Sequence, residues 1–178
     1  MKQLLFILFF PSLLFAQTDS TDIIVQNIMK QQKIVGLSLA VIKKGVPIVN
    51  KGYGLANVEL NVAANNETVF RLGSVSKQFF TTAILKLQEE GKLSINDSVH
   101  KFFPDAPETW RPILEKNLMS HTSGLKRESP AYDNFKMISD LDIIKGTYPL
   151  ALDFKTGEKY RYCNLAYYML AQIITKVS

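Results

Sequence analysis

The sequence is poor in the residues that build cross-links and metal centres. Its 178 residues include one cysteine, Cys163, and two histidines, His100 and His121. A single cysteine excludes an internal disulfide and a cysteine-rich metal site. Two histidines disfavour a histidine-based metal cluster. We therefore expect no metal and no other cofactor.

Long runs of one charge are also missing. The formal net charge is +5, but no more than two basic residues adjoin, at 43–44 and 126–127, and acidic residues are interspersed. This pattern is typical of an ordinary solvated surface and argues against a nucleic-acid partner. The length suits one domain, or one and a part, with a sizeable core.

The longest apolar run is too short to span a membrane. Lys2 precedes the run LLFILFFPSLLFA, which contains Pro11, ends at Ala16 and is followed by the polar segment QTDSTD. A positive start, a short apolar core and a small residue before a polar segment predict a secretory signal peptide over residues 1–16. The mature domain would then occupy residues 17–178. We expect it to be secreted or periplasmic, with no stable membrane span.

The first part of the mature chain predicts one helix and a hairpin. Residues 19–32 have apolar residues at helical spacing, and VGLSLAVIKKGVPIVNKGYG reads as two strands around KKGVP. Gly45 supplies the permissive backbone of the turn, and Pro47 is predicted to end it. A two-stranded sheet is not stable alone, so we expect further strands beyond Ser178.

The remainder of the chain is predicted to be mostly helical. The longest predicted helix covers residues 74–90 and ends at Gly91, a C-terminal cap. Shorter helices are expected in ILEKNLMSH and MISDLDIIKG, and NLAYYMLAQIITKVS predicts an amphipathic helix. The segment DFKTGEKYRY is predicted to form a turn with extended flanks.

Ser74 and Lys77 lie one helical turn apart at the start of the predicted helix 74–90. Residues three apart share a face, so hydroxyl and amine can meet. Lys77 also falls at the margin of an apolar stripe (Phe79, Phe80, Ala83, Ile84, Leu87), where desolvation disfavours its ammonium form. Such a pair is an activated nucleophile beside its base. Chance alone, however, supplies about one Ser-x-x-Lys in a chain of this composition, and the alternative is a surface lysine.

A second polar group precedes the last predicted helix. Tyr162 and Asn164 form a Tyr-x-Asn in which the hydroxyl can reach the nucleophile and the amide can hold the lysine and a substrate. The alternative is a packed tyrosine and a helix-capping asparagine.

Three segments in this order resemble a known superfamily: VFRLGSVSKQFFTTAILKLQEEGKLSINDSV, LMSHTSGL and EKYRYCNLAYYMLAQII. They are similar to the serine β-lactamases and penicillin-binding proteins, and most similar to the class C β-lactamase-like group. The resemblance covers residues 35–178. It implies an α+β, β-lactamase/transpeptidase-like fold with two subdomains, an antiparallel sheet flanked by helices and a helical subdomain. Only the N-terminal portion of that domain would be present, up to the helix after Tyr-x-Asn.

The resemblance also implies roles for four residues. Ser74 would be the acylated nucleophile, and its backbone N–H would form half of the oxyanion hole. Lys77 would accept the serine proton, Tyr162 would shuttle a proton to the leaving group, and Asn164 would orient Lys77 and the substrate. The superfamily's third motif, Lys/His-Thr/Ser-Gly, is expected beyond Ser178.

Three other features are predicted to lie outside the chemistry. His121 in SHTSG invites a Ser-His-Asp interpretation, but the chain has no G-x-S-x-G, and the resemblance makes this histidine a structural residue of a turn. Lys155-Thr156-Gly157 is expected to be a turn rather than the third motif. Cys163 is expected to be unreactive.

The resemblance implies an exported serine hydrolase that acts on a β-lactam, a D-Ala peptide or another amide or ester. The alternative is a catalytically silent module that binds cell-wall peptides in the same pocket. The 178-residue product alone is expected to be inactive and prone to aggregate. In it, the apolar hairpin residues Leu37, Leu39, Val41, Ile48 and Val49 would be partly uncovered.

Overall fold

The computed structural model describes residues 20–178 and divides the chain into two compact units, with the boundary between Arg71 and Leu72. The predicted signal peptide, residues 1–16, lies outside the described residues. Within residues 20–178, no helix is long and apolar enough to cross a bilayer.

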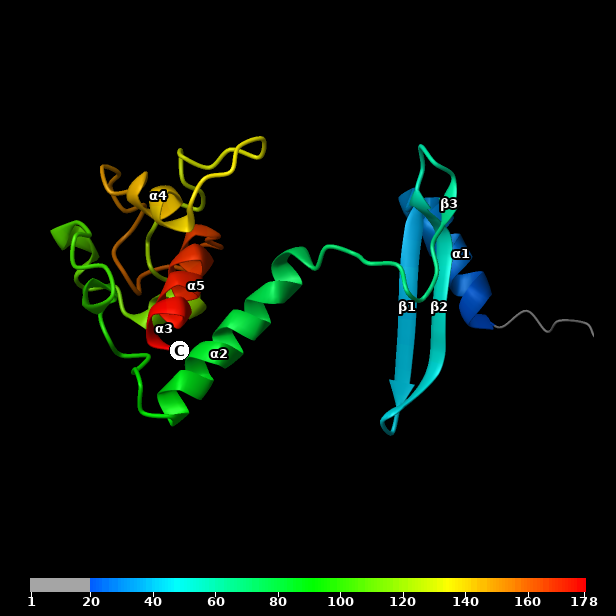
Figure 1. The fold of residues 1–178 in the computed structure, drawn as a ribbon, viewed down its shortest axis with the longest axis horizontal. Coiled ribbons are helices and arrows are strands. Elements are labelled where there is room, and N and C mark those ends of the chain that lie inside the picture. The colour runs from blue at the N-terminus through cyan, green and yellow to red at the C-terminus, as the bar shows by residue number, and fades with distance from the viewer. Residues whose placement is uncertain (1–19) are drawn as a thin grey trace, which may run out of the picture. The chain divides into compact units, whose positions relative to one another are not determined.

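The first unit contains one helix and an antiparallel sheet (Figure 1). Helix α1 (Ser20–Gln32) is followed by β1 (Gly36–Lys43), β2 (Val46–Asn57) and the two-residue strand β3 (Val62–Ala63), in the sheet order β1-β2-β3. The predicted helix and hairpin are confirmed, whereas β3 was not predicted. Two residues are too few to give a recognisable alternation of polar and apolar side chains.

The hairpin turn is tighter than predicted. Lys44 and Gly45 both have positive φ, 50° and 79°, and Lys43 pairs directly with Val46. These are the features of a two-residue turn whose twist suits a hairpin. Pro47 therefore does not end the turn but lies within β2, opposite Ile42. The register shifts beside that pair, and such an irregularity accommodates a residue without an N–H.

A polar contact ties helix α1 to the sheet. Asp22 accepts hydrogen bonds from the Tyr53 hydroxyl at 2.7 Å and from Lys51 Nζ at 3.0 Å. The hydrogen bond from Tyr53 is the main cause that lowers the pKa of Asp22, and the contact with Lys51 adds to it. Val25, on the same helix, is buried.

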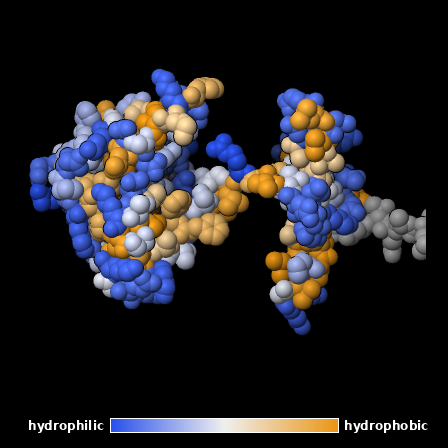
Figure 2. Space-filling model, viewed as in Figure 1, coloured by the Kyte–Doolittle hydropathy of each residue, from blue (hydrophilic) through white to orange (hydrophobic). Residues whose placement is uncertain are grey.

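The predicted exposure of apolar residues on the hairpin agrees with the structure. Val41 and Ile48 are exposed, Ile48 by 59%, and the rest of the predicted set is half-buried (Leu37, Leu39, Val49). Figure 2 shows apolar surface on this unit at the end that carries the β1–β2 turn. Such residues contribute little to stability while they remain in water.

The second unit contains four α-helices and three short 3₁₀ helices, with α5 (Leu165–Val177) at its centre (Figure 1). Helix α5 contacts α2 (Lys77–Glu89), α3 (Glu115–Met119) and α4 (Asp140–Lys145). The 3₁₀ helices are η1 (Gly73–Ser76), η2 (Val99–Lys101) and η3 (Glu108–Trp110). The predicted helix at 74–90 therefore starts as a 3₁₀ turn and ends as predicted before Gly91, whose φ is 71°.

The core of this unit is formed by one face of each helix. Its fully buried members are mainly aliphatic and aromatic (Ile84, Val99, Phe103, Trp110, Ile113, Leu118, Ile144, Leu165, Met169, Leu170, Ile173). The prediction is wrong for one residue of the apolar stripe on α2. Phe79 is 60% exposed, whereas Ile84 and Leu87 are buried, because the buried face of α2 follows residues 80, 84 and 87.

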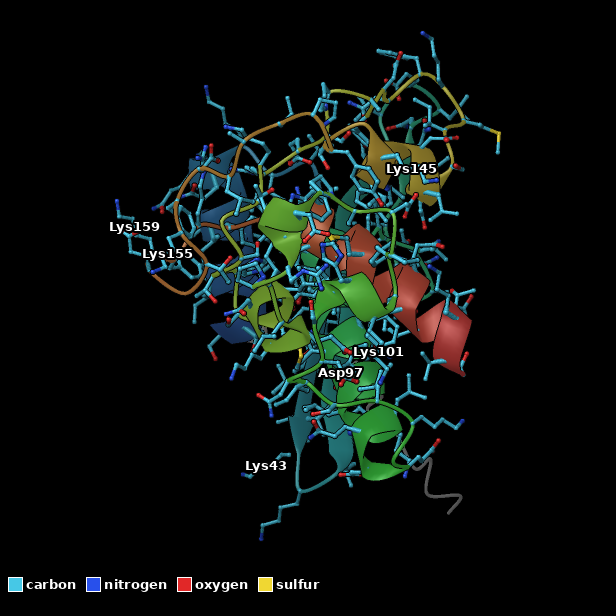
Figure 3. All side chains as sticks on the ribbon, turned by 90° about the vertical axis from the view of Figure 1, so that its left-hand side faces the viewer. Lys43, Asp97, Lys101, Lys145, Lys155 and Lys159 are labelled. Carbon is cyan, nitrogen blue, oxygen red and sulfur yellow. The ribbon has the colours of Figure 1, made fainter. Side chains whose placement is uncertain are left out.

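One carboxylate lies in the core. Glu115, the first residue of α3, is fully buried, and neither of its carboxylate oxygens has a hydrogen-bond partner among the described residues. Burial is the main cause that raises its pKa to about 7, and the nearby charge of Asp97 adds to the shift. Figure 3 shows Asp97 and Lys101 close together, and their ion pair is 2.6 Å long. The buried position of Glu115 was not predicted.

Candidate active site

Ser74 and Lys77 meet at the junction of η1 and α2. Lys77 Nζ donates a hydrogen bond to Ser74 Oγ at 3.3 Å. Gly73 begins the turn with a φ of 52°, and the Ser76 hydroxyl donates to its carbonyl at 2.6 Å. This turn leaves Ser74 exposed, while Lys77 is half-buried. The predicted meeting of hydroxyl and amine is therefore present in the structure.

Tyr162 approaches the same serine from the far end of the sequence. Its hydroxyl donates to Ser74 Oγ at 2.5 Å, and Lys77 Nζ lies 4.9 Å from the centre of its ring. The hydrogen bond with Lys77 is the main cause that lowers the pKa of Tyr162, and the one with Ser74 adds to it. A tyrosine so placed releases its proton more readily than a free phenol.

No hydrogen bond among residues 20–178 engages the backbone N–H of Ser74. The residue lies in the first turn of a helix, where N–H groups lack an intrahelical acceptor. This donor is available to a developing oxyanion.

The ring of His121 packs against the ring of Tyr162. The two ring centres are 4.5 Å apart, and His121 Nδ1 accepts a hydrogen bond from the Cys163 N–H at 3.1 Å. Its carbonyl accepts from the Arg161 N–H at 2.9 Å. Burial, followed by the charge of Lys77, lowers the pKa of His121, so its ring is neutral near neutral pH. The φ of 58° at His121 places it in a turn, in agreement with the structural role that was predicted.

Asn164 differs from the prediction. Its Nδ2 donates to Glu128 Oε1 at 2.6 Å, and no hydrogen bond joins it to Lys77 among the described residues. It occupies the N-cap position of α5 but makes no side-chain cap. Asn164 and Lys77 nevertheless line one cavity. Glu128 was not predicted, because pairing across 36 residues leaves no local pattern.

Cys163 is buried, and its thiol donates to the Lys126 carbonyl at 3.2 Å. Burial is the main cause that raises its pKa to about 11. A thiol held in this way is not a nucleophile near neutral pH, as predicted.

The Lys155-Thr156-Gly157 segment is a turn, as predicted. The Glu158 N–H donates to the Lys155 carbonyl at 3.0 Å, and Gly157 has a φ of 83°. The Thr156 hydroxyl donates to the Ser123 carbonyl at 3.0 Å, which fixes the turn against the segment after His121. Lys155 is exposed, and Figure 3 shows it at the edge of the second unit.

The close contact of these two segments requires glycine at position 124. A Cβ there would lie 2.2 Å from the Phe154 carbonyl oxygen, and the φ of Gly124 is 82°. The Asp153 N–H donates to the Gly124 carbonyl at 2.7 Å. The backbone contact therefore positions the chain that leads to Tyr162.

A cavity of about 620 Å³ opens beside Lys77. Its walls come from η1, α2, the loop after Gly124, α4 and α5, and they combine aromatic, polar and acidic side chains (Ser76, Lys77, Phe80, Glu128, Tyr132, Asp140, Asn164, Tyr167, Tyr168, Ala171). This volume is in the range of small-molecule sites. Within residues 20–178, no group of three or more histidine, cysteine, aspartate and glutamate side chains could hold a metal ion.

Comparison with known proteins gives consistent matches. Residues 22–178 match the Beta-lactamase family. Protein flp of Staphylococcus aureus (strain COL) is 31% identical over 163 residues, which cover 88% of this chain and 33% of that protein. Teichoic acid D-alanine hydrolase of Staphylococcus aureus is 35% identical over 150 residues, which cover 83% and 36%. A solved class C beta lactamase is 28% identical with a TM-score of 0.75, over 89% of this chain and 44% of that one.

These matches confirm the predicted α+β, β-lactamase/transpeptidase-like fold. The chain spans about a third of the length of the two staphylococcal relatives.

Proposed function

The chain belongs to the Beta-lactamase family, and from this premise we propose that the whole protein is an exported serine acyl hydrolase with Ser74 as its nucleophile. The single observation that carries the proposal is the convergence of Lys77 Nζ and the Tyr162 hydroxyl on Ser74 Oγ, at 3.3 and 2.5 Å. Two proton-transferring groups on one exposed hydroxyl are the arrangement that nucleophilic acyl transfer requires.

The acylation step follows from these contacts. Ser74 Oγ attacks the carbonyl carbon of an amide, lactam or ester, and its proton passes to Lys77. The carbonyl oxygen becomes an oxyanion, to which the Ser74 N–H donates. When the tetrahedral intermediate collapses, the bond to the leaving group breaks, Tyr162 gives that group a proton, and Lys77 passes to Tyr162 the proton that it took from the serine. The product is an acyl ester on Ser74. Water or an amine then releases the acyl group, and the serine oxygen recovers a proton.

The lowered pKa of Tyr162 supports its role as the proton shuttle. A shuttle must gain and lose its proton within one catalytic cycle, and the positive charge of Lys77 reduces the cost of the phenolate. His121 is a positioning residue in this scheme, because its ring packs on that of Tyr162.

The names of the relatives support an amide or ester substrate. One relative is named for the hydrolysis of D-alanine from teichoic acid, and a solved structure of similar fold is a class C beta lactamase. We propose substrates of the same chemical range for the whole protein: a lactam, a D-Ala peptide or an alanyl ester. Export follows from the predicted signal peptide and is checked by N-terminal sequencing of the mature protein, which should start near residue 17.

A covalent probe tests the proposal. The full-length protein is incubated with a fluorophosphonate or a fluorescent penicillin and its intact mass is measured. We expect one adduct in the wild type and none in Ser74→Ala, while Ser76→Ala, which removes the neighbouring hydroxyl, keeps it. An adduct that persists in Ser74→Ala would refute the assignment. Probe binding without any covalent adduct in the wild type would favour the silent binding module.

A further inference from the structure

Lys77 lacks the partner that was predicted to orient it. Asn164 donates to Glu128 Oε1 instead, and no ion pair engages Lys77 within residues 20–178. A general base must nevertheless be held within hydrogen-bond reach of the hydroxyl whose proton it takes. A contact other than Asn164 therefore keeps the Lys77 amine near Ser74.

The ring of Tyr167 supplies such a contact. Lys77 Nζ lies over this ring, 5.2 Å from its centre, and over the ring of Tyr162, 4.9 Å from its centre. Both distances are within the range of about 6 Å in which the face of an aromatic ring attracts an ammonium group. Lys77 is the first residue of α2, and Tyr167 lies in the first turn of α5, so the contact joins two packed helices.

The ring of Tyr167 is itself fixed by its neighbours. The residue is buried, and its hydroxyl donates to the Met119 carbonyl at 3.0 Å and lies 3.3 Å from Thr81 Oγ1. Its ring centre is 5.3 Å from that of His121. These neighbours belong to the end of α3, the second turn of α2 and the turn after α3. The ring therefore keeps its face toward Lys77 when the charge of the lysine changes.

The charge on Lys77 changes during the acylation proposed above. The neutral amine takes the proton of Ser74 and becomes an ammonium. A ring face attracts the ammonium but not the neutral amine, so the contact with Tyr167 grows stronger as the proton arrives. An interaction that is stronger in the transition state than in the ground state accelerates a reaction. A ring in this position is therefore suited to raise the rate of acylation through the lysine.

We propose that Tyr167 is a positioning residue for the reaction of Ser74. Its ring face, together with that of Tyr162, holds Lys77 beside the serine and stabilises the ammonium that forms there. The hydroxyl of Tyr167 fixes the ring and transfers no proton. This inference rests on the proposed function and adds one residue to it.

Fluorination of the ring tests this electrostatic role with little change of shape. Phenylalanine, and phenylalanines with one, two and three ring fluorines, replace Tyr167 in the full-length protein. Fluorine withdraws electrons from the ring face and weakens its attraction for a cation. The acylation rate constant is measured at saturating fluorescent penicillin. We expect Tyr167→Phe to stay within about threefold of the wild type, and the rate to fall with each added fluorine, by about tenfold over the series.

A second buried ring provides the matched control. Phe103 lies in the core of the same unit, and Lys176 Nζ is 4.5 Å from its ring centre. The fluorinated series at Phe103 disturbs an ammonium–ring pair away from Ser74 and should leave the acylation rate unchanged. Tyr167→Leu, which keeps apolar volume but removes the ring, should lower that rate at least about tenfold with less than about a twofold change in probe affinity. If Tyr167→Leu does not fold, the fluorinated series decides.

A further measurement needs no turnover. In the full-length protein with ¹³C-labelled lysine, ring currents should shift the ε-CH₂ proton signal of Lys77 upfield, because its Nζ lies over two rings. Lys77→Arg identifies the signal. Tyr167→Leu and Tyr167→Phe are then compared, and only the leucine variant should reduce the shift.

The outcomes separate this inference from the proposed function. If Ser74 is labelled but the rate is the same across the series at position 167, or falls equally in the Phe103 series, the role of Tyr167 is wrong and the hydrolase stands. If no probe labels Ser74 in the wild type, the proposed function fails. In that case, a Lys77 signal that is not shifted refutes the contact with Tyr167, and a shift that only Tyr167→Leu reduces supports it.

Discussion

The hydroxyl of Tyr162 lies 2.5 Å from Oγ of Ser74, although the two residues are 88 positions apart in the chain. The tyrosine reaches the serine because the Cys163 N–H is bonded to His121 and α5 is packed in the centre of its unit. The contacts of this serine therefore depend on tertiary packing as much as on the local turn.

Tyr162→Phe in the full-length protein should lower kcat by about 10²–10⁴-fold, the usual contribution of a general acid or base. The ring remains to pack on His121, so the melting temperature should stay near that of the wild type. The alkaline limb of the pH profile of kcat/KM, where a proton donor of lowered pKa loses its proton, should change in the variant. An unchanged profile would remove Tyr162 from the proton pathway.

Lys77→Arg in the full-length protein should be as damaging as Lys77→Ala, because arginine keeps its proton and cannot act as a base. Acylation rates of the two variants are compared by stopped-flow with a fluorescent penicillin. A Lys77→Arg protein that retains more than about a tenth of the wild-type rate, a loss of less than about 1.4 kcal/mol, would reduce Lys77 to a structural charge.

Lys155→Ala in the full-length protein should be nearly silent in steady-state assays, because Lys155 belongs to a turn. Gly157→Ala is the informative partner, since φ at this position is 83° and a side chain is strained there. It should lower the melting temperature. A loss of activity in Lys155→Ala as large as that in Lys77→Ala would instead indicate that Lys155 belongs to the third motif, Lys/His-Thr/Ser-Gly.

Glu115→Gln should flatten the dependence of stability on pH. The pKa of Glu115 in the folded protein is about 7, against an ordinary value of 4.5. The free energy of unfolding therefore falls as pH rises from about 4.5 to about 7, and above that pH it stays at the lower value. At about 1.4 kcal/mol per pKa unit, this cost is on the order of 3 kcal/mol.

The measurement for Glu115 is urea unfolding of the full-length protein between pH 4.5 and 8, for the wild type and Glu115→Gln. The variant should be the more stable protein at pH 8 and should lose that advantage at low pH. Glu89→Gln is the exposed control and should follow the wild type. Parallel curves for wild type and Glu115→Gln would mean that the buried carboxylate is not destabilising.

Residues 17–178 expressed alone should associate in solution. The apolar hairpin residues, including Val41 and Ile48, are exposed, and a sheet edge next to such residues invites pairing with other chains. Size-exclusion chromatography coupled to light scattering checks this, with Ile48→Lys as a variant that should reduce association. A wild-type monomer with a sharp thermal transition would contradict the prediction.

Local relationships could be predicted from the sequence. Ser74 and Lys77 are three residues apart, and residues at this spacing share one face of a helix. The glycine in Lys155-Thr156-Gly157 favours a reverse turn. Both features depend only on residues close together in the sequence. The position of Tyr162 before α5 was also visible, and its contact with Ser74 was proposed from the Tyr-x-Asn motif, to which the family resemblance added the role of proton shuttle.

Long-range pairs could not be predicted. Glu128 is bound to Asn164 across 36 residues, and Asp140 reaches the same cavity from α4, so no spacing in the sequence joins them. Glu115 reads as a surface residue because charged side chains are seldom buried without a partner. Phe79 was wrongly predicted to lie on the apolar face of its helix. Adjacent apolar residues on a helix point about 100° apart, and only tertiary packing decides which one is buried.

The two halves of the site also differ in the time at which they can form. The turn that joins Ser74 to Lys77 needs only its own helix, and helices form in about 0.1–1 μs. Tyr162 reaches its position after the segment around His121 has met the segment that precedes α5, a contact across 42 residues. Closure of such long loops comes later in folding. During refolding, covalent labelling of Ser74 should therefore begin only after α5 has docked. The time at which labelling begins would then report when the second half of this site has formed.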